Sequence, residues 1–178
     1  MPPLRFPVAV VIERVPLASR WASERWQVGA VERDDMPIPT TVRLSDDASA
    51  TRWRFTGFGV ELHRSEAEGY FLNITALEPK VFVMWRMLEP ESIGADGLAA
   101  RPALVTVSFN EAARLMDGGE TVDALPLPPE IRAWMQPFVD ANYKPEPKRK
   151  NRRNEFYERE DEHRVGGAPS DAATKAGR

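Results

Sequence analysis

Hydrophobic positions along this 178-residue chain follow short-period patterns that predict more strands than helices. Residues 6–15 are rich in Val and Ile, and residues 24–33 alternate in part between apolar and polar side chains. This predicts two strands that pair with each other. Residues 40–44 fit a short edge strand, and residues 103–109 and 121–127 have the same extended character.

The segment from Arg52 to Arg64 predicts a β-hairpin. Apolar and polar side chains alternate in both halves of the segment, and residues 56–59 separate the halves. Gly57 and Gly59 supply the positive φ angles that tight turns require.

The most apolar stretch of the chain, residues 81–87, does not alternate. A strand of this kind is covered on both faces, so the sequence predicts that it lies at the centre of a sheet.

Three segments carry helix signals. Ser65 with Glu68, and Ser108 with Glu111, have the spacing of a capping box, in which the serine caps the helix. Pro129 fits the first turn of a third helix. The apolar positions at helical spacing are Tyr70, Phe71, Ile74 and Leu77 in the first helix, and Ile131, Trp134, Met135, Phe138 and Val139 in the third.

Together these patterns predict an α+β fold, with a largely antiparallel sheet of about six strands and two or three helices. Residues 1–143 are expected to form a single domain. The composition changes after Tyr143, and residues 144–178 are expected to be a flexible basic tail, disordered or ordered only by a partner.

Charge divides the chain in the same place. The net charge is −3, but from residue 144 onward there are 10 Lys and Arg against 7 Asp and Glu, and residues 1–143 carry 14 against 20. A basic tail on an acidic body can bind the body itself or an acidic partner. The candidate partner-binding residues are Lys144, Lys148, Arg149, Lys150, Arg152 and Arg153.

Composition also limits the chemistry. The chain has no Cys and only two His, which excludes thiol catalysis and any Cys-ligated metal site. Apolar runs are far shorter than the ~20 residues of a membrane helix. We therefore expect a soluble cytoplasmic protein with no cofactor, no metal and no membrane contact.

His63 is the main candidate for catalysis, because Glu61 and Glu66 are near it in sequence and a His beside a carboxylate can act as a base. A His at the rim of a sheet among charged residues explains the same pattern. Convergence of His63 with acids and arginines inside a deep, enclosed cleft would favour catalysis. Ser65 and Ser108 are accounted for as helix caps, and no catalytic residue is predicted.

Several segments together resemble a bacterial family, catalogued as domain of unknown function 3305. The resemblance covers roughly residues 8–153 and keeps their linear order. Its segments are Val11 to Leu17 with Trp21 and Trp26, Val60 to Tyr70, Val81 to Arg86, Leu104 to Ser108, and Pro126 to Pro129 leading into Trp134.

Members of that family have no established activity and no assigned catalytic residues, and they are often encoded near genes for molybdenum-dependent formate dehydrogenase. Some carry a label for molybdopterin-guanine dinucleotide synthesis. This chain does not support that label, because no Gly-rich nucleotide loop follows its first predicted strand.

The resulting hypothesis is a non-catalytic accessory or binding protein that acts in maturation or assembly of molybdenum-dependent formate dehydrogenase. Its partner would be a formate dehydrogenase subunit or a maturation factor. One alternative is a nucleic-acid-associated protein that binds through the basic tail. Another is an enzyme of small metabolites, which would need a concave pocket with converging polar groups.

The nucleic-acid alternative predicts binding to duplex or RNA that weakens steeply with salt, because bound phosphates release counterions. Neutralising Lys148, Arg149, Lys150, Arg152 and Arg153 together should abolish that binding in a fluorescence-anisotropy titration. Absent or salt-insensitive binding by the unaltered chain would dispose of this alternative.

Overall fold

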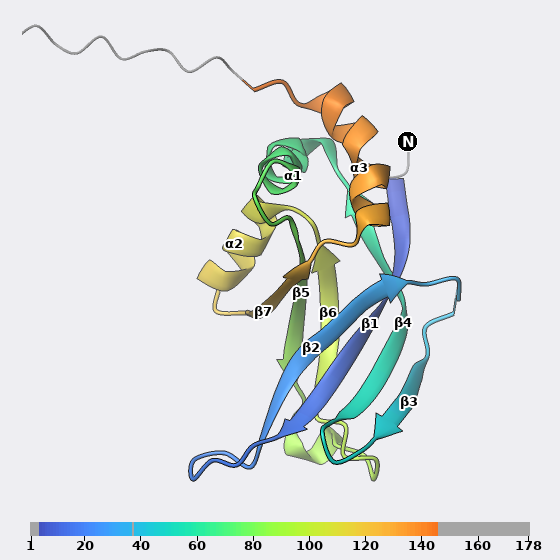
Figure 1. Ribbon diagram of the computed structural model, residues 1–178, viewed down its shortest axis with the longest axis vertical. Helices are drawn as coiled ribbons and strands as arrows, with labels where there is room; N and C mark the ends of the chain where they lie inside the picture. The colour runs from blue at the N-terminus through green and yellow to red at the C-terminus, as the bar shows by residue number, and fades with distance from the viewer. Residues whose placement is uncertain (1–3, 37, 146–178) are drawn as a thin grey trace, which may run out of the picture. The chain divides into compact units, whose positions relative to one another are not determined.

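The computed structural model describes residues 4–36 and 38–145. Within these residues the chain forms seven strands, three α-helices and two short 3₁₀ helices (Figure 1). The strands are β1 (Leu4–Pro16), β2 (Glu24–Arg33), β3 (Thr41–Asp46), β4 (Thr51–Leu62), β5 (Lys80–Met87), β6 (Ala100–Thr106) and β7 (Thr121–Pro126). The helices are α1 (Ala67–Ile74), α2 (Phe109–Asp117) and α3 (Pro129–Asn142), with 3₁₀ helices at Arg64–Glu66 and Pro90–Ser92.

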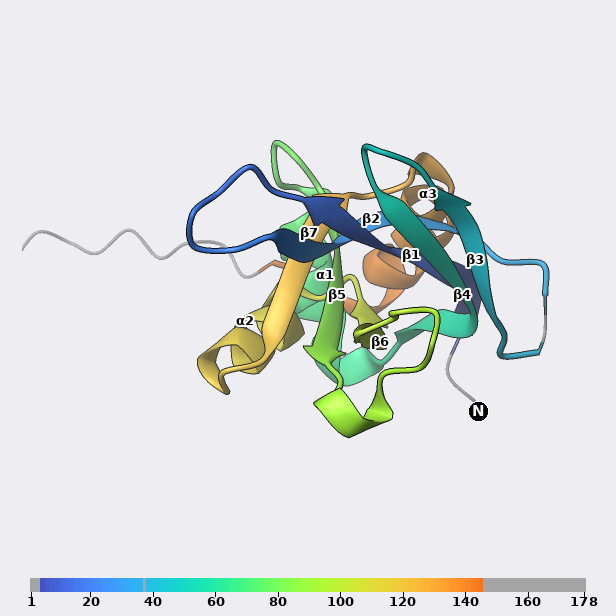
Figure 2. The same cartoon turned by 90° about the horizontal axis from the view of Figure 1, so that it is seen from below.

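The strands form two antiparallel sheets, one in the order β2-β1-β4-β3 and the other in the order β6-β5-β7. The two sheets lie one over the other in Figure 2 and share a hydrophobic core. The predicted α+β class and antiparallel pairing are confirmed, but the strands are divided between two sheets. The chain leaves the first sheet through α1, and β5 then pairs only with the later strands β6 and β7.

The first sheet is built around β1, which pairs with β2 along one edge and with β4 along the other. Val8, Val10 and Ile12 of β1 are fully buried in the shared core. The pairing predicted for the first two strands is confirmed, and β3 is an edge strand as predicted.

The predicted hairpin at residues 52–64 is wrong, because β4 runs without a turn from Thr51 to Leu62. Val8 of β1 pairs with Phe58, and Val10 pairs with Phe55. Between these pairs β4 has one residue more than β1, which is the definition of a β-bulge.

Gly57 lies in this bulge with a φ of 85°. The glycine therefore provides left-handed backbone for a bulge and not for a hairpin turn. A Cβ atom at position 57 would also lie only 2.8 Å from the ring of Pro39.

The bulge explains the hydrophobic pattern that suggested two strands. Trp53 and Phe55 have odd numbers and Val60 and Leu62 have even numbers, yet all four side chains lie in the core. Side chains in a strand alternate between faces, so one extra residue reverses the alternation and keeps both halves of β4 facing inward.

β5 lies at the centre of the second sheet, as predicted, and residues 81–85 are all buried. Val81, Val83 and Trp85 belong to the core that the two sheets share. On the opposite face, the ring of Phe82 lies 5.3 Å from that of Phe109 in α2. The absence of alternation in the sequence thus reflects cover on both faces.

The two predicted capping boxes have different outcomes. Ser108 caps α2, because its Oγ accepts a hydrogen bond from the Glu111 N–H at 3.1 Å. Ser65 is not a cap: α1 begins after Glu66, which makes no side-chain cap. The Glu66 carboxylate instead accepts hydrogen bonds from Ser108 Oγ (2.7 Å) and Arg114 Nη2 (2.6 Å).

The predicted third helix is confirmed, with Pro129 in its first turn and Ile131, Met135 and Val139 buried. The apolar face predicted for α1 is shorter than expected. The helix ends at Ile74, before the predicted position Leu77, which is fully exposed.

Asp34 is a buried carboxylate that joins the β2–β3 connection to the bulge. Its side chain is 0% exposed, and it accepts hydrogen bonds from the N–H groups of Met36 and Gly57, both at 2.9 Å. Arg54 Nη2 lies 3.5 Å away. Burial alone would raise the pKa of Asp34, but the two N–H donors and the Arg54 guanidinium together hold that pKa below its ordinary value.

Replacing Asp34 with Ala should lower the free energy of unfolding by about 2–4 kcal/mol, because two buried N–H groups and Arg54 lose their acceptor. Asp35→Ala is the matched control. Asp35 is an exposed neighbour whose only ion pair among the described residues is with Arg33, so its removal should cost less than about 1 kcal/mol. Urea denaturation measures both, and equal losses would contradict the role assigned to Asp34.

The cost of Asp34→Ala should also depend on pH. The pKa of Asp34 is lower in the folded than in the unfolded chain, so its contribution is complete at neutral pH. That contribution is lost as pH falls below about 4, where the unfolded carboxyl takes up a proton first. The difference in unfolding free energy between wild type and Asp34→Ala should therefore shrink as pH falls.

Candidate functional site

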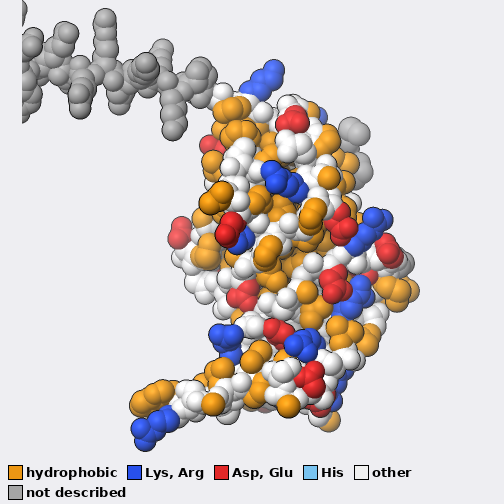
Figure 3. Space-filling model, viewed as in Figure 1, with side chains coloured by type: hydrophobic (Ala, Val, Ile, Leu, Met, Phe, Trp, Pro, Cys, Tyr) orange, Lys and Arg blue, Asp and Glu red, His pale blue; other side chains and the backbone are white. Residues whose placement is uncertain are grey.

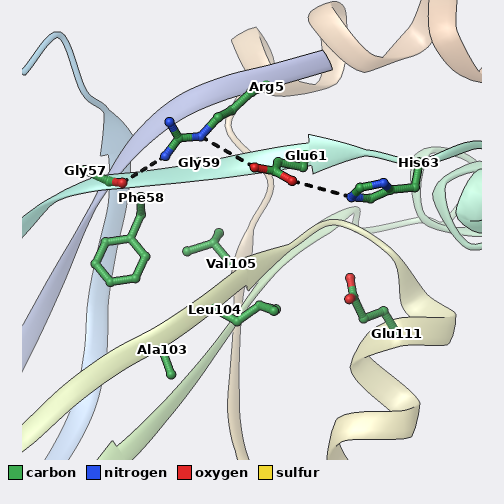
Figure 4. A pocket seen from close by; sticks show the side chains of 10 residues that line it. All are labelled: Arg5, Gly57, Phe58, Gly59, Glu61, His63, Ala103, Leu104, Val105 and Glu111. Atoms are coloured by element: carbon green, nitrogen blue, oxygen red, sulfur yellow. Dashed lines mark hydrogen bonds and ion pairs between the residues drawn. The ribbon is translucent and has the colours of Figure 1, made fainter. Parts of the chain in front are cut away.

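His63 follows β4 and ends a row of three polar side chains in which Glu61 lies between it and Arg5, as Figure 4 shows. Its Nε2 is 3.6 Å from Glu61 Oε2, and Glu61 Oε1 is 3.8 Å from Arg5 Nε. Arg5, on β1, also donates a hydrogen bond from Nη2 to the Gly57 carbonyl at 2.9 Å. The bulge, the end of β4 and the start of β1 thus meet in one row of polar groups.

This row forms one side of an open groove of about 300 Å³. The other side is Ala103, Leu104 and Val105 of β6, and Glu111 of α2 lies near one end (Figure 4). The side chains of Arg5, Glu61 and His63 are about half exposed, at 51%, 45% and 52%. His63 therefore meets one acid, and that acid meets an arginine, but at an open surface where ion pairs are weak.

Tyr70 of α1 holds the backbone at this end of β4. Its buried hydroxyl accepts a hydrogen bond from the His63 N–H (3.1 Å) and donates one to the Glu61 carbonyl (3.2 Å). Burial raises the pKa of Tyr70 to about 12, so the hydroxyl keeps its proton. The helix thereby fixes the backbone positions from which the Glu61 and His63 side chains project.

The loop between β1 and β2 carries the most exposed tryptophan. Trp21 is 94% exposed, whereas Trp26, five residues later, is buried and stacks on Trp53 with ring centres 5.3 Å apart. A backbone hydrogen bond from Leu17 to Ser23 (2.9 Å) closes the loop at its root. Figure 3 shows a narrow projection from the body with hydrophobic and basic groups at its tip, where Figure 1 places this loop.

The sequence signal for this loop is weak. Residues 17–23 separate the first two predicted strands, and Trp21 is the one large aromatic residue among them. The Ala and Ser residues on both sides of Trp21 and Arg20 are the available signal, because small side chains cannot cover an indole. Arg20 and Arg25 are exposed, and neither forms an ion pair within the described part of the chain.

A polar depression of about 490 Å³ lies at the root of the same loop. Arg14 lines it and donates to Thr51 Oγ1 at 3.1 Å, and Thr51 Oγ1 donates to Asp46 at 2.7 Å. Asp47 lines it too, and hydrogen bonds from Ser49 lower the pKa of Asp47 to about 2. The pKa of Asp46 is lowered too, mainly by the hydrogen bond from Thr51, so both aspartates are charged at neutral pH.

Of the predicted partner-binding residues, only Lys144 lies in the described part of the chain, where it is exposed just after α3. Lys148, Arg149, Lys150, Arg152 and Arg153 lie outside the described residues. No α-helix within residues 4–36 and 38–145 is both long and apolar enough to span a bilayer. Within the same residues, no group of three His, Asp or Glu side chains lies close enough together to hold a metal ion.

Comparison with protein families matches residues 7–152 to a family described as protein of unknown function, DUF3305. No curated protein and no solved structure gives a significant match. The matched segment includes every strand and helix described above except the first residues of β1. The chain therefore belongs to the DUF3305 family.

Proposed function

We propose that this protein is a non-catalytic accessory protein that binds a partner protein through the β1–β2 loop, residues 17–23. The observation that carries the proposal is the 94% exposure of Trp21 at a projecting loop. Trp is the residue most enriched at the energetic centres of protein interfaces, and one Trp buries roughly 150–250 Å² when a partner covers it. Covering that surface with a partner removes apolar area from water, which favours binding.

The charges near Trp21 support a partner with an apolar pocket surrounded by carboxylates. Arg20 and Arg25 are exposed and have no acidic partner within the described residues. Arg is itself enriched at interface centres, and its planar guanidinium binds carboxylates with two hydrogen bonds. In the proposed interface, Trp21 supplies most of the affinity and the two arginines orient the partner.

The basic tail is proposed as a second contact with the same partner. It begins at Lys144, and its net charge of 10 basic against 7 acidic residues is opposite to that of residues 1–143. Two weak contacts on one chain raise the overall affinity, because the second forms at a high effective concentration.

We propose further that the partner is a subunit or maturation factor of molybdenum-dependent formate dehydrogenase, and that the protein works in the cytoplasm. The support for this partner is the family resemblance and the expected gene neighbourhood of that family. The docking loop supports a protein partner of some kind, and the formate dehydrogenase link identifies which partner to test.

Replacing Trp21 with Ala should lower the amount of partner recovered roughly tenfold or more, because an interface-centre Trp contributes at least that much. The measurement is a pull-down from the native host with quantification of formate dehydrogenase subunits and maturation factors. Leu77→Ala is the matched control, since Leu77 is fully exposed elsewhere. Thermal unfolding of both variants should equal wild type.

Two results would overturn separate parts of the proposal. Equal recovery with Trp21→Ala and Leu77→Ala would remove the loop as the docking site. If the wild-type chain recovers no formate dehydrogenase component, and a deletion strain keeps normal formate dehydrogenase activity, the proposed partner is wrong.

A further inference from the structure

β3 is the outer strand of the first sheet, and β4 is its only neighbour within the described residues. Val42 and Leu44 of this strand are about half exposed, and in the connection that leads to it Met36 is about half and Ile38 about two-thirds exposed. An edge strand with unpaired backbone groups and exposed apolar side chains is a template for pairing with another strand.

The hydrogen bonds show which backbone groups of β3 face outward. The Thr56 N–H donates to the Thr40 carbonyl at 2.9 Å, so Thr40 faces β4. Successive residues of an antiparallel strand direct their N–H and C=O groups to opposite edges. The backbone N–H and C=O of Val42 therefore also point toward β4. The N–H and C=O groups of Thr41 and Arg43 point outward, where the described part of the chain offers no partner.

The Arg43 side chain does not block this edge. Its guanidinium binds the Asp46 carboxylate of the same strand and lies 5.9 Å from the centre of the Trp53 ring. The charge that would repel a neighbouring strand is therefore largely neutralised within the chain.

We infer that β3 pairs with β3 of a second copy of this chain, antiparallel and centred on Val42. In this register Thr41 of each copy exchanges two hydrogen bonds with Arg43 of the other, so all four outward residues of the pair are satisfied. Val42 lies directly opposite its own counterpart, and the two apolar side chains cover each other.

The neighbouring registers are poorer for identifiable reasons. A shift that centres the pair on Arg43 sets Thr41 opposite Ser45 of the other copy, beyond the register irregularity that interrupts the regular strand. A shift that centres it on Thr41 brings Pro39 opposite Arg43, and Pro39 has no N–H to donate. The edge is thus self-complementary in one register, as a two-fold symmetric contact requires.

A register irregularity between Arg43 and Ser45 limits the regular pairing to a few residues. Bulges and short length are the usual devices that protect edge strands. The contact is therefore small, and the dimer is a reversible one that forms as concentration rises.

The absence of Cys from the chain makes the register directly testable. Opposed residues of a non-hydrogen-bonded antiparallel pair have Cα atoms about 4.5 Å apart, within the range that a disulfide spans. Full-length Val42→Cys should form a disulfide-linked dimer under mild oxidation, seen on a non-reducing gel. Full-length Leu77→Cys, with its thiol on a fully exposed position elsewhere, should cross-link roughly tenfold more slowly or not at all.

Sedimentation analysis of the chain without cysteine provides the second measurement. Wild type should show a monomer–dimer equilibrium, and Thr41→Pro should weaken it roughly tenfold, because two of the four hydrogen bonds are lost. Pro is tolerated as the first residue of a strand, so the fold should persist, which circular dichroism checks.

Three outcomes would overturn the inference: a wild-type chain that stays monomeric at all concentrations, Val42→Cys that cross-links no faster than Leu77→Cys, or dimerisation that Thr41→Pro leaves unchanged. The last outcome would place the contact between copies at another surface. Strand pairing with a different protein would appear as a monomer in both experiments.

Discussion

The extra residue in β4 is the constraint on which the rest of the first sheet depends. Without it, either Trp53 and Phe55 or Val60 and Leu62 would point to solvent, and the core would lose two of its larger side chains. The left-handed backbone of Gly57 makes the bulge possible. The Asp34 carboxylate holds it in place by accepting the Gly57 N–H in the protein interior.

The surfaces with functional interest follow from that arrangement. The second half of β4 brings Glu61 and His63 to the groove beside β6, and Tyr70 fixes the backbone there. The connection held by Asp34 leads directly into β3 and so places that strand at the sheet edge. The groove, the β3 edge and the bulge are therefore linked through β4 and Asp34, whereas the Trp21 loop is independent of them.

Features that depend on neighbouring residues could be predicted from the sequence. The apolar run in β5 indicated cover on both faces, and the Ser108 cap needed only Glu111, three residues later. The hairpin prediction failed because a turn and a bulge both need a glycine with positive φ. What decides between them is Asp34, 23 residues away in sequence.

The same limit applies to the other errors. Ser65 with Glu68 has the local pattern of a cap, but Glu66 is bound by Ser108 and Arg114 from a distant helix, and α1 begins after it. The small residues around Trp21 are only a weak local sign that it is exposed while Trp26 is buried. Exposure depends on what the rest of the fold places nearby, which no short stretch of sequence contains.

The β1–β2 loop is joined to the body by its two strands and closed by one hydrogen bond between Leu17 and Ser23. Trp21 contributes almost nothing to the core, so its replacement leaves the free energy of folding nearly unchanged. Recognition and folding are then separable properties of this chain. Relatives with the same two sheets are free to differ in loop length and tip residues. Each such loop would bind a different partner without lowering the stability of the two sheets.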